Sequence, residues 1–496
     1  MKEGFEIICQ RGAVATGPAE AARAAATLLE RGNAMDAAAA ACLACAVMEP
    51  QAVDMGGYVL AAVVLDGATG EVWSLDANTV APAAATEDMF TTAPVRSGLP
   101  DPPGINEREW GCTVLGDANV YGPLAVSVPG FVAGVGTLSE RWGRLKWAEI
   151  VEPARKLVIE GLPYSRVLAD LDYKREAISR YSSTTAFLTR RGADLWFRPE
   201  LARTLERLSA AGWRDFYEGE LGDEIVSFVA SQGGILTRED MSAFTPRITR
   251  PCSGTYHGAE IHTAIPPNGG FSVLDAMEDL EKESLPPEND PKYWEIMSKV
   301  LARMWRVRLA DSWPAGAAPH GTVHVATADV YGNVVSATIS TGGLWGACFA
   351  VPGTGIILSH GMCRFDPHPG RSNSPGPRKR PLNNVCPLLI RMADRDVAIG
   401  TRGGRRIVSA CVQLAHRIID YGASASQAAA APRIHTITGD PVEISPNFDP
   451  AVRSALERAG NHVLTPDELA RAVHGAEILR PECAIRAGGN DWSAGI

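Results

Sequence analysis

The sequence lacks the features that mark nucleic-acid-binding and membrane-spanning proteins. Its 496 residues carry 47 Lys and Arg against 57 Asp and Glu, a formal charge of −10, whereas a nucleic-acid-binding surface needs an excess of basic residues. The longest apolar run near the N-terminus, AAAAACLACAVM, has 12 residues. A helix that crosses a bilayer needs about 20. We therefore expect neither a nucleic-acid partner nor a membrane partner.

Signals for export and for cofactors are also missing. The first residues, MKEGFEIICQRGAVATG, show no basic segment followed by an apolar segment and a small-residue cleavage site, so we expect a cytoplasmic protein. Neither VPGFVAGVG nor GTRGGRR matches a glycine-rich nucleotide-binding motif. We infer no cofactor.

Metal-binding patterns are weak. The ten cysteines show no zinc-ribbon spacing, and the single C-x-x-C, Cys42 to Cys45, lies in an alanine-rich stretch where both residues read as small core side chains. His320 and His324 are four residues apart on a predicted strand, but no third ligand is evident. We expect no metal site.

What the sequence does contain is enough apolar material, 46% of its residues, for one large core. Helices are predicted at 19–31, 36–49, 406–421 and 449–460, a hairpin at 51–82 turning at 66–67, mainly helical structure at 115–305, and strands in HVATADVYGNVVSATIS, GIILSHGM and CPLLIRMADRDVAIGT. Long blocks of both kinds predict a layered α+β fold with sheets inside and helices outside.

The stretch HGTVHVATADVYGNV, residues 320 to 334, raises a question of chemistry. If Thr322 begins a strand, alternation sends His320, Thr322 and His324 to one face. A threonine hydroxyl is a poor nucleophile, but a threonine at a chain N-terminus carries its own base, because an α-amine titrates at about pKa 7.7 to 8.0. Gly321 would let the backbone bring this hydroxyl to the preceding carbonyl.

Several motifs resemble those of the γ-glutamyltranspeptidase family, in the same order along nearly the whole chain. They are ERGNAMDAAAAACLACAVMEPQAVDMGG, APAAATEDMF, GPLAVSVPGFVAG, GGILTREDMSAF, HGTVHVATADVYGNVVSATIS, RKRPLNN, GTRGGRRI, IDYG and AAPRIH. The ordered set is far more specific than any single motif.

The resemblance implies an N-terminal-nucleophile hydrolase with a four-layer αββα fold that cleaves itself between Gly321 and Thr322. A large subunit, 1–321, and a small subunit, 322–496, would form one structural unit, and further pairing of such heterodimers stays open. Thr322 would form an acyl-enzyme that water or an amine resolves. Gly403 and Gly404 fall on a pair whose N–H groups stabilise the oxyanion, and Ser340 falls near a threonine that supports the nucleophile.

Departures from the family pattern concern the substrate. Asn78 stands where the family has an arginine that grips the α-carboxylate of the γ-glutamyl group, and Asn383 and Asn384 replace a Ser-Ser pair that also touches it. Arg364 stands where an aspartate holds the α-amino group. A guanidinium repels an ammonium, so γ-glutamyl donors should fit badly, whereas Arg364 suits a carboxylate.

Three further features bear on the substrate and on the mechanism. Residues 364–406 hold ten Lys or Arg against three Asp, a balance of +7, which favours an anionic substrate. The segment 365–378 is shorter than the family's lid over the pocket, which favours hydrolysis over transfer. The stretch RLADSWPAGAAPHG before the cleavage point is also short, which puts the geometry of self-cleavage in question.

The leading hypothesis is a self-processing hydrolase or acyltransferase that cleaves an amide, or a related acyl bond, of a small anionic molecule bearing a carboxylate. The alternatives are a true γ-glutamyl hydrolase or transpeptidase with a rearranged clamp, and a hydrolase of a C–C bond in a keto-acid intermediate of secondary metabolism. A chain that is never cleaved and serves as a binding protein is the alternative from another class.

Overall fold

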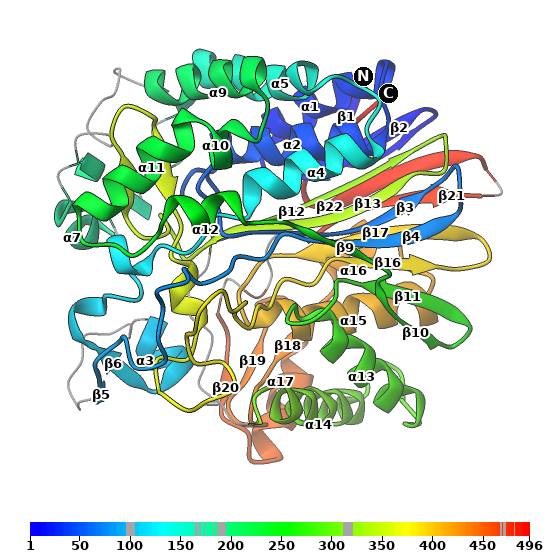
Figure 1. The fold of residues 1–496 in the computed structure, drawn as a ribbon. Helices are drawn as coiled ribbons and strands as arrows, with labels where there is room; N and C mark the ends of the chain where they lie inside the picture. Colours follow the sequence, from blue (N-terminus) through cyan, green and yellow to red (C-terminus); the bar gives the residue numbers. More distant parts are fainter. Residues whose placement is uncertain are drawn as a thin grey trace.

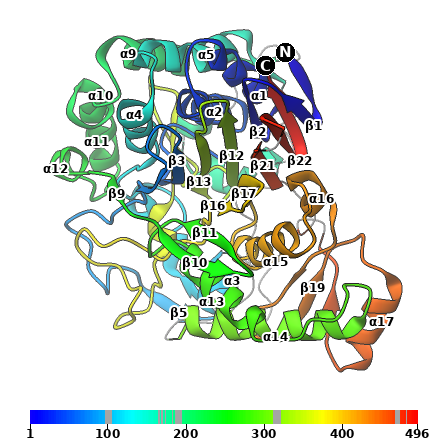
Figure 2. The same ribbon diagram turned by 90° about the vertical axis from the view of Figure 1, so that its right-hand side faces the viewer.

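Two β-sheets stacked face to face lie between two layers of helices in the computed structural model (Figure 1). A view turned by 90° shows the same order of helix, sheet, sheet and helix (Figure 2). The structure describes residues 1–95, 105–163, 167, 170–172, 174–181, 183–185, 195–310, 321–466, 469, 473–480 and 482–496. The predicted α+β class, with sheets inside, is confirmed.

One hydrogen-bonded path of antiparallel strands runs through both sheets. The upper sheet in Figure 1 has the order β2 (Gly12–Thr16), β12 (Gly321–Asp329), β13 (Val334–Gly342), β3 (Val59–Asp66), β4 (Glu71–Asp76), β9 (Arg247–Thr249). The lower sheet has the order β10 (Cys252–Tyr256), β11 (Ala259–Thr263), β16 (Leu388–Arg391), β17 (Arg395–Thr401), β21 (Val473–Leu479). The long strand β22 (Ala484–Gly495) joins the sheets, because it pairs with β21, with β2 and with β1 (Lys2–Cys9).

The two outer layers are helical. The upper layer contains α1 (Ala19–Ala26), α2 (Ala34–Met48), α4 (Phe131–Trp142), α5 (Trp147–Glu160) and α9 (Pro199–Ala211). The lower layer contains α13 (Gly270–Glu281), α14 (Pro291–Arg308), α15 (Arg406–Asp420) and α17 (Pro450–Arg458), with α16 (Ala425–Ala430) beside them. Within the described residues, every helix is too short or too polar to cross a membrane.

Smaller elements decorate these layers. The remaining helices are α3 (Ile105–Trp110), α7 (Arg175–Ser179), α10 (Asp215–Glu218), α11 (Glu220–Ser231) and α12 (Arg238–Ser242). The remaining strands are β5 (Thr92–Pro94), β6 (Cys112–Val114), β7 (Leu162–Pro163), β8 (Leu195–Trp196), β14 (Phe349–Val351), β15 (Ile356–Leu358), β18 (Ile434–His435), β19 (Val442–Ile444) and β20 (Val463–Leu464).

Alternation along β12 decides which side chains enter which core. Val323 and Val325 join the core between the upper sheet and its helices, whereas Ala326 and Ala328 join a core of mostly small residues between the sheets. Thr322 and His324 therefore lie on the face that looks toward the lower sheet. Small side chains between the sheets let the two sheets approach closely at this point.

Most predicted elements are confirmed, and the differences have physical causes. The hairpin β3–β4, the pair β12–β13 and the helices α15 and α17 match the predicted segments. The helix predicted to open at Asp36 begins earlier, because the side chain of Asn33 caps it and Asp36 bonds back to the Asn33 N–H. The strands β1, β2, β10, β11, β21 and β22 were not predicted.

Candidate active site

Thr322, near the start of β12, and Ser340, near the end of β13, are register partners and face each other across the two strands. Their hydroxyl oxygens are 3.1 Å apart, and Thr322 is 3% exposed. The Ser340 hydroxyl also donates to the carbonyl oxygen of Gly321 and accepts from the Gly342 N–H at 2.9 Å. One serine therefore contacts both the candidate nucleophile and the carbonyl of the peptide bond that would be cut.

Gly403 and Gly404 lie between the end of β17 and the start of α15. Their φ angles, +136° and +60°, are ones that glycine adopts readily. Within the described part of the chain, neither N–H donates to an acceptor. Gly400 packs against the His324 ring, since a Cβ at Gly400 would come within 2.4 Å of His324 Cε1. The glycine pair therefore lies a few residues beyond Gly400, where β17 packs against His324 of β12. The free N–H groups of the pair suit the binding of an oxyanion.

His324 is buried, and its ring is hydrogen-bonded to side chains of β13. Its Nδ1 is hydrogen-bonded to Thr338 at 2.9 Å, and the Ser336 hydroxyl lies 3.4 Å from its Nε2. Burial holds the pKa of His324 well below its ordinary value, so the ring is neutral at pH 7. His320 lies outside the described residues, as does the rest of 311–320. The described residues contain no cluster of three or more potential metal ligands.

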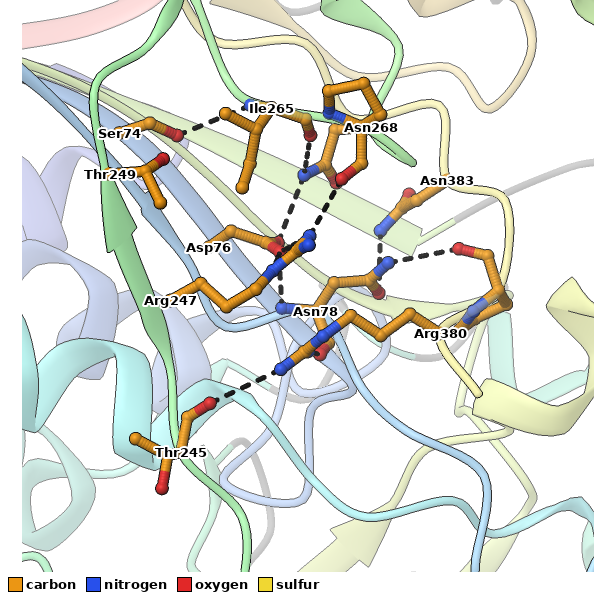
Figure 3. Close-up of polar contacts among 12 residues, drawn as sticks. Ser74, Asp76, Asn78, Thr245, Arg247, Thr249, Ile265, Asn268, Arg380 and Asn383 are labelled. Carbon is orange, nitrogen blue, oxygen red and sulfur yellow. Dashed lines mark hydrogen bonds and ion pairs between the residues drawn. The ribbon is translucent and has the colours of Figure 1, made fainter. Parts of the chain in front are cut away.

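Asn78 and Asn383 bind each other. The Asn383 Nδ2 donates to Asn78 Oδ1 at 3.2 Å, and the Asn78 Nδ2 donates to the Pro381 carbonyl at 3.1 Å (Figure 3). The Asn78 N–H donates to Asp76, whose carboxylate also binds Arg247. The two positions where the family binds a carboxylate are thus joined by hydrogen bonds within the protein.

Tyr58, just before β3, completes this network. Its hydroxyl donates to Asn383 Oδ1 at 3.0 Å, and its N–H donates to the Ser340 carbonyl at 3.0 Å. Burial raises the pKa of Tyr58, so the phenol stays protonated. Tyr58 therefore connects Ser340, the partner of Thr322, with Asn383, one of the predicted substrate-binding residues.

Arg364 is buried, and α3 supplies its counterion. Its Nη2 lies 3.1 Å from Glu109 Oε2, and these side chains are only 5% and 2% exposed. The Arg405 guanidinium donates to the Glu109 carbonyl at 2.9 Å. The Trp110 Nε1 donates to the Cys363 carbonyl at 3.2 Å, which fastens α3 to the segment that carries Arg364. The Glu109 carboxylate therefore lies beside Arg364, the residue that replaces the family's aspartate.

Asn384 contacts Arg308 at the end of α14. The Arg308 Nη2 lies 3.4 Å from Asn384 Oδ1 and also donates to the Asn383 carbonyl. Burial, with a smaller contribution from nearby Arg405, lowers the pKa of Arg308 to about 10, so the group stays cationic at pH 7. Among the described residues, no carboxylate forms an ion pair with Arg308.

The basic excess of residues 364–406 is partly neutralised in space, although Arg480 and Arg486 from outside the segment also bind the carboxylates of Asp396 and Glu477. The ion pairs with carboxylates outside this segment are Arg364 with Glu109, Arg378 with Glu239, Arg395 with Glu477, Arg402 with Glu49 and Arg406 with Glu443. The balance of +7 counted along the sequence therefore overstates the local positive charge and gives little support to an anionic substrate.

The segment 365–378 lies against the protein. Its Asn373 Nδ2 donates to the Arg364 carbonyl at 2.8 Å, and its Oδ1 accepts from the Leu382 N–H at 2.8 Å. These contacts connect the segment with both ends of the predicted substrate region.

Sequence reasoning missed Tyr58, Glu109 and Arg308 as members of the site. Tyr58 follows the glycine turn of a quoted motif, so its place after MGG was a usable signal. Glu109 and Arg308 carry no such signal, because each reaches the site only through the packing of α3 or α14. The structure connects Ser340, the partner of Thr322, with Asn383 and Asn78 through Tyr58, whose N–H donates to the Ser340 carbonyl and whose hydroxyl donates to Asn383. The charge of Arg364 acts on the same phenol.

The four-layer fold is that of the N-terminal-nucleophile hydrolases. The profile of the family described as Gamma-glutamyltranspeptidase matches residues 21–313 and 302–495, so the chain belongs to this family of enzymes. It is 30% identical to the acylase ACY 1 proenzyme of Pseudomonas sp. (strain V22), over 98% of this chain and 92% of that protein. It is 27% identical to the glutathione hydrolase proenzyme of Escherichia coli (strain K12), over 92% and 86%.

Solved structures agree with this placement. The crystal structure of cephalosporin acylase from Bacillus halodurans superposes with a TM-score of 0.83 at 25% identity and covers 99% of this chain and 96% of that chain. The γ-glutamyltranspeptidase of Helicobacter pylori gives a TM-score of 0.50 at 29% identity, over 60% and 82%. The family thus contains both acylases and glutathione hydrolases among the relatives of this chain.

Proposed function

We propose that this protein is a self-processing acylase that uses Thr322 to hydrolyse an amide, or a related acyl bond, whose acyl group carries a carboxylate. The observation that carries the proposal is the position of Ser340, whose hydroxyl contacts both Thr322 and the Gly321 carbonyl. The proenzyme names of its relatives support processing into a large and a small subunit.

This geometry supports self-cleavage by the following steps. Thr322 Oγ1 attacks the Gly321 carbonyl carbon, the Gly321–Thr322 C–N bond breaks, and the hydroxyl proton passes to the Thr322 nitrogen. Water then hydrolyses the resulting ester, which leaves a carboxylate on Gly321 and a free amine and hydroxyl on Thr322. The Ser340 O–H polarises the carbonyl that is attacked, because it donates to the oxygen where negative charge develops.

Turnover repeats these steps on the substrate. The Thr322 amine takes the hydroxyl proton as Oγ1 attacks the substrate carbonyl, and the same proton leaves with the departing amine. Water resolves the acyl-enzyme and releases the acid. The N–H groups of Gly403 and Gly404 are the donors we assign to the oxyanion.

The charges around the site favour an acyl group with a carboxylate. Arg405 interacts electrostatically with Arg308 and with Arg364, and the carboxylate of Glu109 acts on both Arg364 and Arg405. The positions that would hold an α-carboxylate in γ-glutamyl substrates are instead bonded to each other, so we place the substrate's carboxylate at Arg364.

Glu109 favours a second candidate, a γ-glutamyl hydrolase with a rearranged clamp. Its carboxylate could bind the α-ammonium while Arg364 binds the α-carboxylate, which would restore both contacts from new positions. Glutathione hydrolases among the relatives agree with this candidate.

The first experiment is the intact mass of the wild type beside Thr322→Ala. We expect fragments of 321 and 175 residues (496 minus 321) from the wild type and a whole chain from the variant. An uncut wild-type chain would overturn self-processing and bring the binding-protein alternative forward.

The second experiment compares glutaryl p-nitroanilide with γ-glutamyl p-nitroanilide, which differ only in the α-ammonium group. We expect kcat/KM to be at least about tenfold higher for the glutaryl compound, since tenfold corresponds to about 1.4 kcal/mol and like-charge contact costs more than that. Arg364→Lys keeps the charge and serves as the control. Preference for γ-glutamyl that disappears in Glu109→Gln would establish the second candidate instead.

A further inference from the structure

A serine, a histidine and a glutamate lie in contact on the hairpin β10–β11, which forms one end of the lower sheet (Figure 1). The Ser253 Oγ is 2.7 Å from His262 Nδ1, and the His262 Nε2 is 3.3 Å from Glu260 Oε2. A nucleophile, a base and a group that orients the base follow one another in the same way in hydrolases that act through a serine. None of the residues assigned to the Thr322 site lies on this hairpin.

The turn of the hairpin places Ser253 opposite His262. The two-residue turn 257–258 has positive φ at both positions, +44° and +83°, and the pair of residues that flanks such a turn is hydrogen-bonded. Ser253 and His262 are three pairs further along, so they form a non-hydrogen-bonded pair, in which the side chains approach most closely. Glu260 is two residues before His262 and therefore lies on the same face of β11.

The same alternation directs the backbone N–H of Ser253 away from β11. Among the described strands, β10 pairs only with β11, so this N–H lies on the open edge of the sheet. The Ser253 side chain is exposed, whereas His262 is only 9% exposed. An acyl group can therefore reach the hydroxyl from the open edge, where the N–H is available to the oxygen that gains negative charge.

The surroundings of His262 keep its ring neutral, as a base requires. Burial lowers the pKa of His262, and the Glu260 carboxylate opposes that shift. The other charged groups that act on the ring are Arg391 of β16 and Asp396 of β17, which are paired with each other at 3.2 Å. A carboxylate beside Nε2 favours the tautomer with the proton on that nitrogen, so Nδ1 accepts from the Ser253 hydroxyl.

We propose that Ser253 is a second nucleophile of this protein, which takes an acyl group from small uncharged carboxylic esters at the open edge of β10. Ser253 Oγ attacks the ester carbonyl carbon as its proton passes to His262 Nδ1. The bond to the leaving oxygen then breaks and the same proton leaves with it, so the products are an acyl-serine and an alcohol. The Glu260 carboxylate, 60% exposed, disfavours anionic esters. The proposal is independent of the role of Thr322.

The test is acetylation by p-nitrophenyl acetate, followed by mass mapping of the modified peptides. Thr322→Ala is the parent protein, because it removes the other proposed nucleophile. We expect Ser253 to be acetylated at least about a hundredfold faster than Ser231 in the same sample, the gain that a positioned base provides. Ser231, at the end of α11, is an exposed serine whose hydroxyl donates to the Phe228 carbonyl at 2.7 Å rather than to a histidine.

Two variants separate catalysis by the base from simple exposure of the serine. His262→Gln should lower the acetylation rate of Ser253 by about a hundredfold. Glu260→Gln should lower it by about threefold, because an exposed carboxylate contributes weakly, and this surface change keeps the hairpin folded. Acetylation of Ser253 at the rate of Ser231, or at an unchanged rate in both variants, would overturn the proposal. Neither result bears on cleavage at Gly321, which the intact mass measures separately.

Discussion

Gly321 has no room for a side chain. A Cβ at this position would lie 2.7 Å from Ala52 Cα and 2.8 Å from the Gln51 carbonyl oxygen, both of them backbone atoms that cannot turn aside. The register of β12 against β13 also shifts between Gly321 and Thr322. At the scale of one residue, therefore, the peptide bond before Thr322 is held in place by a close backbone contact.

We predict that Gly321→Ala slows self-cleavage by about tenfold or more, because a displacement that costs about 1.4 kcal/mol in the transition state has this effect. The measurement is the fraction of uncut chain by intact mass at fixed times after synthesis. Gly254→Ala is the control, since its Cβ would meet only the Leu274 side chain, at 3.3 Å. Processing of Gly321→Ala at the wild-type rate would show that this contact is not needed.

At the scale of elements, α15 connects the site with the lower helical layer. Its first turn follows Gly403 and Gly404, and its Ser409 accepts from the Trp305 Nε1 at 2.9 Å and is hydrogen-bonded to His435 Nδ1 at 2.8 Å. Burial lowers the pKa of His435 to about 4. The ring is therefore neutral in the folded protein at any pH above that value.

This lowered pKa predicts loss of stability in acid. The unfolded chain takes up a proton on His435 near pH 6.5, whereas the folded protein resists until about pH 4, so the contribution is present above pH 6.5 and is lost as the pH falls toward 4. Between pH 7 and 4.5 the loss is about 2 kcal/mol. Urea unfolding of the wild type and His435→Asn at both pH values measures it, and equal losses in the two proteins would contradict the assignment.

At the scale of the whole molecule, β22 shows why a central strand can escape prediction from the sequence. Strand β22 contains the run Ala-Gly-Gly-Asn and shows no regular alternation, yet it holds both sheets together because its two halves pair with β21 and β2. Such a strand is defined by its neighbours more than by its own propensities. Periodic segments such as α15 and the β12–β13 pair were predictable because each buries one face of regular spacing.

The sequence by itself determined the family, the α+β class and the residues that lie along β12, β13 and the Gly403–Gly404 turn. These follow from features that can be read along the chain: the order of the motifs, the alternation of side chains in strands and the backbone conformations that glycine allows. Only the tertiary structure decided that Glu109 pairs with Arg364, that Tyr58 joins Ser340 to Asn383, and that carboxylates from elsewhere offset the basic segment. Such pairings join residues far apart in the sequence, and their energy depends on distance and burial, which residue order does not specify.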